Sequence, residues 1–239
     1  MSLANAAYGL FVLPESLPPH KRAPFVWKRA NPVGALVLLR SQPQLLGLAS
    51  AAFLYQLAHE SLPAVFVFYA GHRYGWDEMD VGLTLALVGA CGVIVQGGLT
   101  HHVVKRVGER RTLLIGLGFG VLGFLVYGLA PVSWMVLVGV PIMALWGLTG
   151  PSVQALMSRR VSPTQQGQLQ GAQGSLRGIA AMFGPFLFTS VFRWGIDESR
   201  AVQVPGAHFL VAAGLLVMAL GVARVVTRES APSLDSKAT

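Results

Sequence analysis

The stretch TLLIGLGFGVLGFLVYGLA, residues 112–130, decides the class of this protein. It contains 19 consecutive residues without a charged side chain, close to the roughly 20 apolar residues with which a helix crosses the core of a bilayer. The whole chain of 239 residues is 53% hydrophobic and only 12% charged, whereas soluble domains carry about 25% charged residues. A water-soluble core cannot hide this much apolar surface. The sequence therefore predicts an all-α, multi-pass membrane protein.

Five further apolar runs are also long enough to span a bilayer. The six expected spans are residues 45–70, 80–100, 112–130, 134–157, 169–192 and 206–226.

The segments outside these spans complete the expected organisation. Residues 1–13 contain an apolar stretch too short to span, which we interpret as the end of an earlier helix, with a short interfacial helix as the alternative. Residues 14–44 are rich in proline and basic residues and are expected to form a cytoplasmic linker. Residues 227–239 are expected to form a cytoplasmic tail.

Lysine and arginine alternate between the two sides of the expected spans. Fourteen of the 18 lie before the first span, in the second and fourth gaps and at the end of the chain from Arg224 on, against three in the other gaps. Positive charge in short loops marks the cytoplasmic side, so we expect both chain ends in the cytoplasm. The net charge of +8 thus follows from topology and does not indicate nucleic-acid binding, because no basic stripe is interleaved with stacking aromatic residues.

A glycine pattern within the third span resembles a dinucleotide-binding motif. Gly118, Gly120 and Gly123 have the G-x-G-x-x-G spacing, but no strand precedes them and no acidic residue follows at the distance that a ribose partner needs. We expect these glycines, together with Gly116, to let helices approach closely.

The sequence offers no set of catalytic or metal-binding residues. Ser152 and His208 are expected at opposite depths of the membrane, which excludes a serine–histidine pair. The lone Cys91 excludes an intrachain disulfide and a zinc cluster of cysteines. We expect no enzyme activity, cofactor or metal.

Glu60 is the most informative single residue. It is expected near the middle of the first span, where a charged side chain costs at least about 2.5 to 3.5 kcal/mol. Gln56 lies one helical turn earlier on the same face, His59 is adjacent, and Pro63 is expected to weaken the helix just beyond. The group can line a water-filled pathway and accept a proton; a structural role, protonated or paired with a neighbouring helix, is the alternative.

Other polar residues inside the spans extend this set. Arg177, one turn after Gln173, can face the pathway or an anion, or extend to the interface as a structural residue. Gln96 and Gln154 can join the pathway or form hydrogen bonds between helices. The candidate transport pathway therefore comprises Gln56, Glu60, Gln96, Gln154, Gln173 and Arg177.

The loop between the second and third spans holds a compact basic motif. Gly108 can supply the left-handed turn between two helices. The flanking arginines can cap helix C-termini or pair with acidic residues, and a solvated basic loop is the alternative. The candidate loop residues are Arg106, Gly108, Arg110 and Arg111.

This loop, RVGERR at residues 106–111, resembles the second-half copy of the cytoplasmic loop signature of the major facilitator superfamily. The strings RYGWD at 73–77 and QGQLQG at 166–171, with Ser158-Arg159 and Gly184-Pro185, resemble the C-terminal half of tetracycline-resistance-type efflux transporters. The resemblance covers residues 13 to 226.

The resemblance implies helices seven to twelve of a twelve-helix transporter, preceded by a stub of helix six, in a bacterial cytoplasmic membrane. It implies alternating access, with a small hydrophobic drug or metabolite exported against protons, and the missing N-terminal half or a second copy as partner. Glu60 stands where these pumps have a glutamine, and Gly92 where they have a histidine, so the drug itself is not carried over. The loop also departs from the signature at His101 and Lys105.

Two further functions are compatible with the sequence. One is a membrane subunit that does not transport and stabilises a partner through its small-residue faces. The other is a half-size transporter that acts as a dimer.

Overall fold

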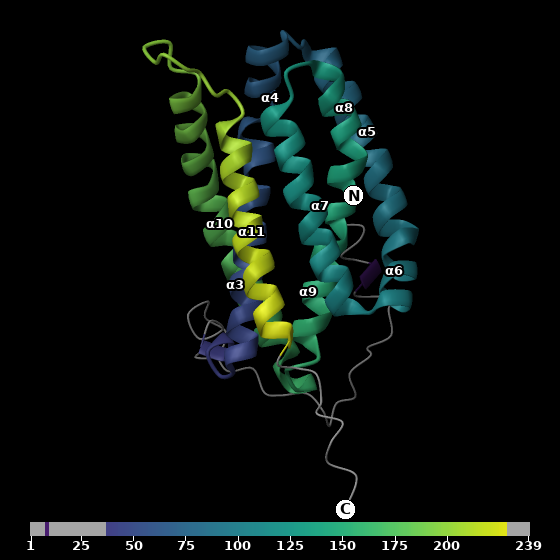
Figure 1. Ribbon diagram of the computed structural model, residues 1–239. Coiled ribbons are helices and arrows are strands. Elements are labelled where there is room, and N and C mark those ends of the chain that lie inside the picture. The colour runs from purple at the N-terminus through teal and green to yellow at the C-terminus, as the bar shows by residue number, and fades with distance from the viewer. Residues whose placement is uncertain (1–7, 10–36, 229–239) are drawn as a thin grey trace, which may run out of the picture.

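The computed structural model describes residues 8–9 and 37–228, and all regular structure in these residues is helical (Figure 1). Most of the expected stub at 1–13, most of the linker at 14–44 and most of the tail at 227–239 lie outside the described residues. Within the described part, the predicted all-α class is confirmed.

The described helices run back and forth between the two ends of an elongated bundle in six passes (Figure 1). In chain order the passes are α3 (Pro43–His59) with α4 (Ser61–Tyr74); α5 (Glu78–Ile94), the π-helical segment η2 (Val95–Leu99) and α6 (Thr100–Val107); α7 (Glu109–Leu129); α8 (Ser133–Leu145), the 3-10 segment η3 (Trp146–Leu148) and α9 (Thr149–Ser158); the 3-10 turn η4 (Pro163–Gln165) with α10 (Gln166–Gly195); and α11 (Ala207–Arg228).

Two glycines mark the ends of the bundle. Gly75 follows α4 with a φ of 68°, and Gly108 joins α6 to α7 with a φ of 83°, both in the region that favours glycine. The positive φ expected at Gly108 is therefore confirmed. We call the end that contains the start of α3, α7 and α10 the Gly108 end, and the opposite end the Gly75 end.

Five of the passes are long and apolar enough, within the described residues, to cross a membrane: Glu78–Val107, Glu109–Leu129, Ser133–Ser158, Pro163–Gly195 and Ala207–Arg228. They correspond to the second to sixth expected spans. The first expected span differs because it is divided into α3 and α4, of 17 and 14 residues.

The division of the first pass falls at Glu60. Pro63 has no N–H, so the carbonyl of His59 cannot receive the helical hydrogen bond that the residue four positions later normally donates. The helix also tightens at this point, because the Glu60 N–H donates to Leu57 O at 3.1 Å, three residues earlier rather than four. The sequence predicted a weak point just beyond Glu60, and the structure has it at Glu60 itself.

The core is formed where α11 packs along α3 on one side and α7 on the other (Figure 1). Close approach at α7 depends on glycine: a Cβ at Gly116 would lie 2.6 Å from Thr149 Oγ1, and one at Gly120 would lie 2.6 Å from Trp146 Cδ1. A Cβ at Gly123 would lie 3.1 Å from Met143 Cε, whereas a Cβ at Gly118 would meet nothing within 4 Å. The predicted packing role is confirmed for Gly116, Gly120 and Gly123 and is wrong for Gly118.

Candidate functional site

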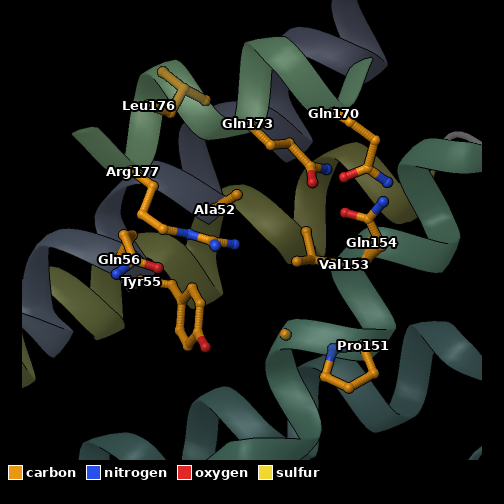
Figure 2. A pocket seen from close by; sticks show the side chains of 11 residues that line it. Ala52, Tyr55, Gln56, Pro151, Val153, Gln154, Gln170, Gln173, Leu176 and Arg177 are labelled. Carbon is orange, nitrogen blue, oxygen red and sulfur yellow. The ribbon is translucent and has the colours of Figure 1, made fainter. Parts of the chain in front are cut away.

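A cavity of about 420 Å³ lies between α3, α9 and α10 (Figure 2). It occupies the half of the bundle nearer the Gly108 end, where α3 and α10 begin and α9 ends. Its polar lining residues are Tyr55, Gln56, Gln154, Gln170, Gln173 and Arg177. This volume is within the range of about 300 to 1,000 Å³ that small-molecule sites in proteins occupy.

Helical spacing brings these polar groups to one space. On α10, Gln170, Gln173 and Arg177 are three and four residues apart and therefore share one face. On α3, Tyr55 and Gln56 face them across the cavity (Figure 2). A polar stripe on α10 thus faces polar side chains of α3 and α9 within a largely apolar bundle.

Arg177 is the one charged residue among those that line the cavity. Its side chain extends from α10 into the space between α3 and α9 (Figure 2). Within the described part of the chain no carboxylate lies within ion-pair distance of it. The Arg177 side chain is exposed, so the cavity is open at this position.

Glu60 lies at the edge of the cavity and does not line it. Gln56 Nε2 donates a hydrogen bond of 3.4 Å to Glu60 Oε1, which connects the carboxylate to the lining. On its other side Glu60 packs against α10 so closely that a methyl group at Gly184 would collide with Glu60 Cβ. The Cβ and Cγ of Glu60 therefore pack against the glycine of α10, while its carboxylate accepts the hydrogen bond from Gln56.

The structure does not bring Gln96 into the cavity. Gln96 lies in the π-helical segment η2, which faces the 3-10 segment η3 of the fourth pass. A Cβ at Gly147 would lie 3.8 Å from both Gln96 Cγ and Nε2, so the two irregular segments meet at this side chain. Gln56, Gln154, Gln173 and Arg177 of the candidate set share one cavity, Glu60 adjoins it, and Gln96 is separate.

Tyr55 and Gln170 line the cavity but were not among the predicted residues. Gln170 had a usable signal, because it is three residues before Gln173 on the same helical face. Tyr55 had none that distinguishes it from an ordinary core aromatic residue. Its ring packs edge-on against Trp146, with the centroids 5.3 Å apart.

The candidate loop residues link different helices at the Gly108 end. Glu109 Oε1 and Arg159 Nη2 form an ion pair of 2.8 Å between the start of α7 and the end of α9. Arg110 Nε donates to Thr227 Oγ1 on α11 at 3.0 Å. The prediction that the loop arginines pair with acidic residues is not met among the described residues, because the ion pair joins Glu109 of the loop to Arg159 of another loop.

Ser152 and His208 make separate contacts, as expected. The Ser152 hydroxyl donates to Leu148 O at 2.8 Å within the fourth pass. The His208 ring packs at the Gly75 end against Tyr69, Phe192 and Phe209.

The sequence profile of the Major Facilitator Superfamily matches residues 1–185. The chain belongs to the Major Facilitator Superfamily. Members of this superfamily are membrane transporters and not enzymes, in agreement with the sequence analysis. The chain is accordingly a multi-pass membrane protein.

Several known proteins are similar in sequence to this chain. Tetracycline resistance protein, class C, from Escherichia coli is 28% identical over 218 residues, which are 90% of this chain and 53% of that protein. Tetracycline resistance protein, class G, from Vibrio anguillarum is 37% identical over 159 residues, 65% of this chain and 40% of that protein. Human hippocampus abundant transcript-like protein 1 is 26% identical over 98% of this chain and 50% of its own length.

The fold is shared with a solved member of the superfamily. The crystal structure of the human organic anion transporter MFSD10 (TETRAN) matches 93% of this chain and 55% of its own chain with a TM-score of 0.77, at 22% identity. The chain thus spans about half the length of the relatives it matches. The predicted half of a major facilitator fold is confirmed.

Proposed function

We propose that this chain forms one half of an alternating-access transporter that exports a small hydrophobic drug or metabolite, coupled to protons. The observation that carries the proposal is the polar cavity between α3, α9 and α10, with the exposed Arg177 on its open side in an otherwise apolar bundle. A charged side chain within a membrane is costly, so such residues usually mark a substrate or ion pathway. In superfamily transporters the substrate site lies near mid-membrane between two halves.

The proposed partner is a second six-helix unit, either an N-terminal half or another copy of this chain. The cavity lies between α3, α9 and α10 and needs a facing unit to enclose a substrate. Vesicles that contain only this chain separate the two arrangements: solute uptake by the chain alone indicates a dimer. Uptake that appears only when a separate N-terminal unit is added indicates that the partner is an N-terminal half and not a second copy.

Glu60 is the proposed proton acceptor. A carboxylate can bind and release one proton, and the hydrogen bond from Gln56 connects it to the cavity lining. The proposal is supported by the position of Glu60 at the interruption between α3 and α4. Proton binding there can therefore influence both the cavity and the helix that borders it.

The test uses the transport unit in vesicles with an imposed pH gradient and a pH-sensitive dye inside. Addition of hydrophobic compounds, tetracycline among them, is expected to produce solute-dependent proton movement. Glu60→Gln should reduce this movement at least about tenfold, because the amide cannot bind and release the proton. Arg193→Gln, on the exposed end of α10, is the control. Proton movement that is undiminished in Glu60→Gln would remove Glu60 from the mechanism.

We also propose that the Gly108 end faces the cytoplasm of a bacterial inner membrane. The basic loops collect at this end, as the charge distribution requires. In a Cys91→Ala background, a membrane-impermeant maleimide added to intact cells should label Ser199→Cys. Ser162→Cys should react only after the cells are broken. The reverse labelling would overturn this orientation.

A further inference from the structure

The charged lining of the cavity is of one sign. Arg177 contributes a full positive charge, and no aspartate or glutamate is among the lining residues. The nearest candidate, Glu60, accepts a hydrogen bond from Gln56 and packs against Gly184. Gly184 is seven residues along α10 from Arg177, about 10 Å at 1.5 Å per residue. Among the described residues no carboxylate forms an ion pair with Arg177, whose exposed side chain lies on the open side of the cavity.

The polar groups around Arg177 are neutral and can each donate as well as accept hydrogen bonds, so their donors can serve an oxygen-rich anion. Gln154 and Gln170 point toward one another from α9 and α10, with Gln173 beside them (Figure 2). The amides of Gln154 and Gln170 can each donate two N–H bonds and the Tyr55 hydroxyl can donate one. Gln173 has one N–H left for a ligand, because its Nε2 also donates to Met157 Sδ at 3.3 Å. A guanidinium surrounded by neutral donors binds a carboxylate or sulfonate through short, charge-assisted hydrogen bonds.

The rest of the lining defines the other part of the ligand. Ala52, Val153 and Leu176 add apolar surface to the same space. A cavity of about 420 Å³ has room for a small ring system beside the charged group. A bare inorganic anion would leave this apolar surface in contact with water.

We infer that Arg177, with the amides of Gln154, Gln170 and Gln173, forms a subsite for the anionic group of the substrate, so that the substrate is a hydrophobic organic anion. The identification of the bound anion as a substrate rests on the proposed transport function. It narrows the expected class of hydrophobic drugs and metabolites to those that carry a carboxylate or a comparable negative charge.

The test is a binding comparison with the full chain in phosphatidylcholine nanodiscs at pH 7.5. The probes are 2-naphthoate, 2-naphthamide and 2-naphthylmethylammonium, which share one ring system and differ in charge. Calorimetry is expected to show that naphthoate binds at least tenfold more tightly than naphthamide and that the ammonium compound binds most weakly.

Two variants of Arg177 assign the preference to its side chain. Arg177→Gln should abolish the tenfold preference for naphthoate, while Arg177→Lys should keep part of it, because an ammonium retains the charge but not the two-pronged guanidinium geometry. Arg193→Gln removes the same charge from another part of α10 and should keep the full preference. Circular dichroism and thermal unfolding establish that each variant is folded.

Two results would overturn the inference. One is equal affinity of the wild-type chain for naphthoate and naphthamide, and the other is a preference that persists in Arg177→Gln. A lipid head group has the same anionic chemistry, so the experiment is repeated with phosphatidylglycerol in the nanodiscs. Unchanged naphthoate binding supports a soluble anion. Loss of binding that depends on Arg177 assigns the subsite to lipid and overturns the substrate assignment.

Failure of this inference is distinct from failure of the proposed function. Anion binding through Arg177 without solute-dependent proton movement in any vesicle contradicts the transport proposal and leaves the anion subsite in place. Transport that shows no preference between the three probes contradicts the anion subsite and leaves the transport proposal in place.

Discussion

Gly116 and Gly118 lie two residues apart on α7, yet their surroundings are opposite. A side chain at Gly116 would be 2.6 Å from Thr149 Oγ1 and 2.9 Å from the backbone nitrogen of Thr149, whereas a side chain at Gly118 would contact nothing within 4 Å. Backbone atoms cannot move aside as the end of a flexible side chain can. Contact between α7 and the fourth pass therefore depends on the absence of a Cβ at Gly116.

The pair provides a matched test at the level of single residues. Gly116→Ala should lower the free energy of unfolding by about 1 to 3 kcal/mol, as other overpacked core substitutions do. Gly118→Ala should leave it unchanged or raise it by up to about 1 kcal/mol, because alanine has the higher helix propensity. Denaturation in detergent, followed by circular dichroism, measures both. Equal effects of the two substitutions would contradict the packing role of Gly116.

Among the elements, the first pass differs most from a regular membrane helix. It is divided at Glu60, three residues before Pro63, and the fourth pass changes to the 3-10 segment η3 shortly before Pro151. In each case a proline withholds the N–H that would bond to the carbonyl four residues earlier. The divided pass contacts α10 on the face that carries Gly184, which places the irregularity beside the candidate proton acceptor.

Restoring the missing hydrogen bond tests the importance of the division. Pro63→Ala should join α3 and α4, raise the free energy of unfolding by up to about 3 kcal/mol, and reduce proton movement in vesicles by fixing the helix beside Glu60. Pro43→Ala is the control, because Pro43 begins α3, where the missing N–H has no helical partner. A more stable Pro63→Ala chain with full proton movement would show that the division does not matter for transport.

At the scale of the whole molecule, the Gly108 end is connected by polar contacts between passes. The Glu109–Arg159 ion pair joins α7 to the end of α9, and the Arg110–Thr227 hydrogen bond joins α7 to α11. The Arg159 side chain is 75% exposed, so the ion pair contributes less than about 1 kcal/mol to stability. We propose that its role is to hold the Gly108 end in one arrangement while the pathway opens and closes.

Exchanging the charges of Glu109 and Arg159 distinguishes an effect on transport from an effect on stability. Glu109→Arg should alter the rate of solute-dependent proton movement severalfold, while thermal unfolding changes little. The double substitution Glu109→Arg with Arg159→Glu should recover the rate, because it restores an ion pair between the same helices. No recovery in the double variant would indicate that the two residues act independently.

The sequence by itself determined the class of the protein, the positions of its apolar passes and the distribution of its charges. These properties depend on composition along the chain, because a bilayer selects any sufficiently long apolar helix whatever its neighbours are. The resemblance of the loop at Gly108 to a family signature could also be seen in the sequence, and the family profile confirms it.

Only the tertiary structure decided which polar residues share a site and where the helices are interrupted. Gln96 and Gln154 are both glutamines within apolar spans, yet only Gln154 reaches the cavity, because helix rotation and packing determine the direction of each side chain. Pro63 accompanies a divided pass, whereas Pro185 lies inside a continuous α10. A proline removes the same hydrogen bond in either place, and the packing of neighbouring helices determines whether the helix stays regular.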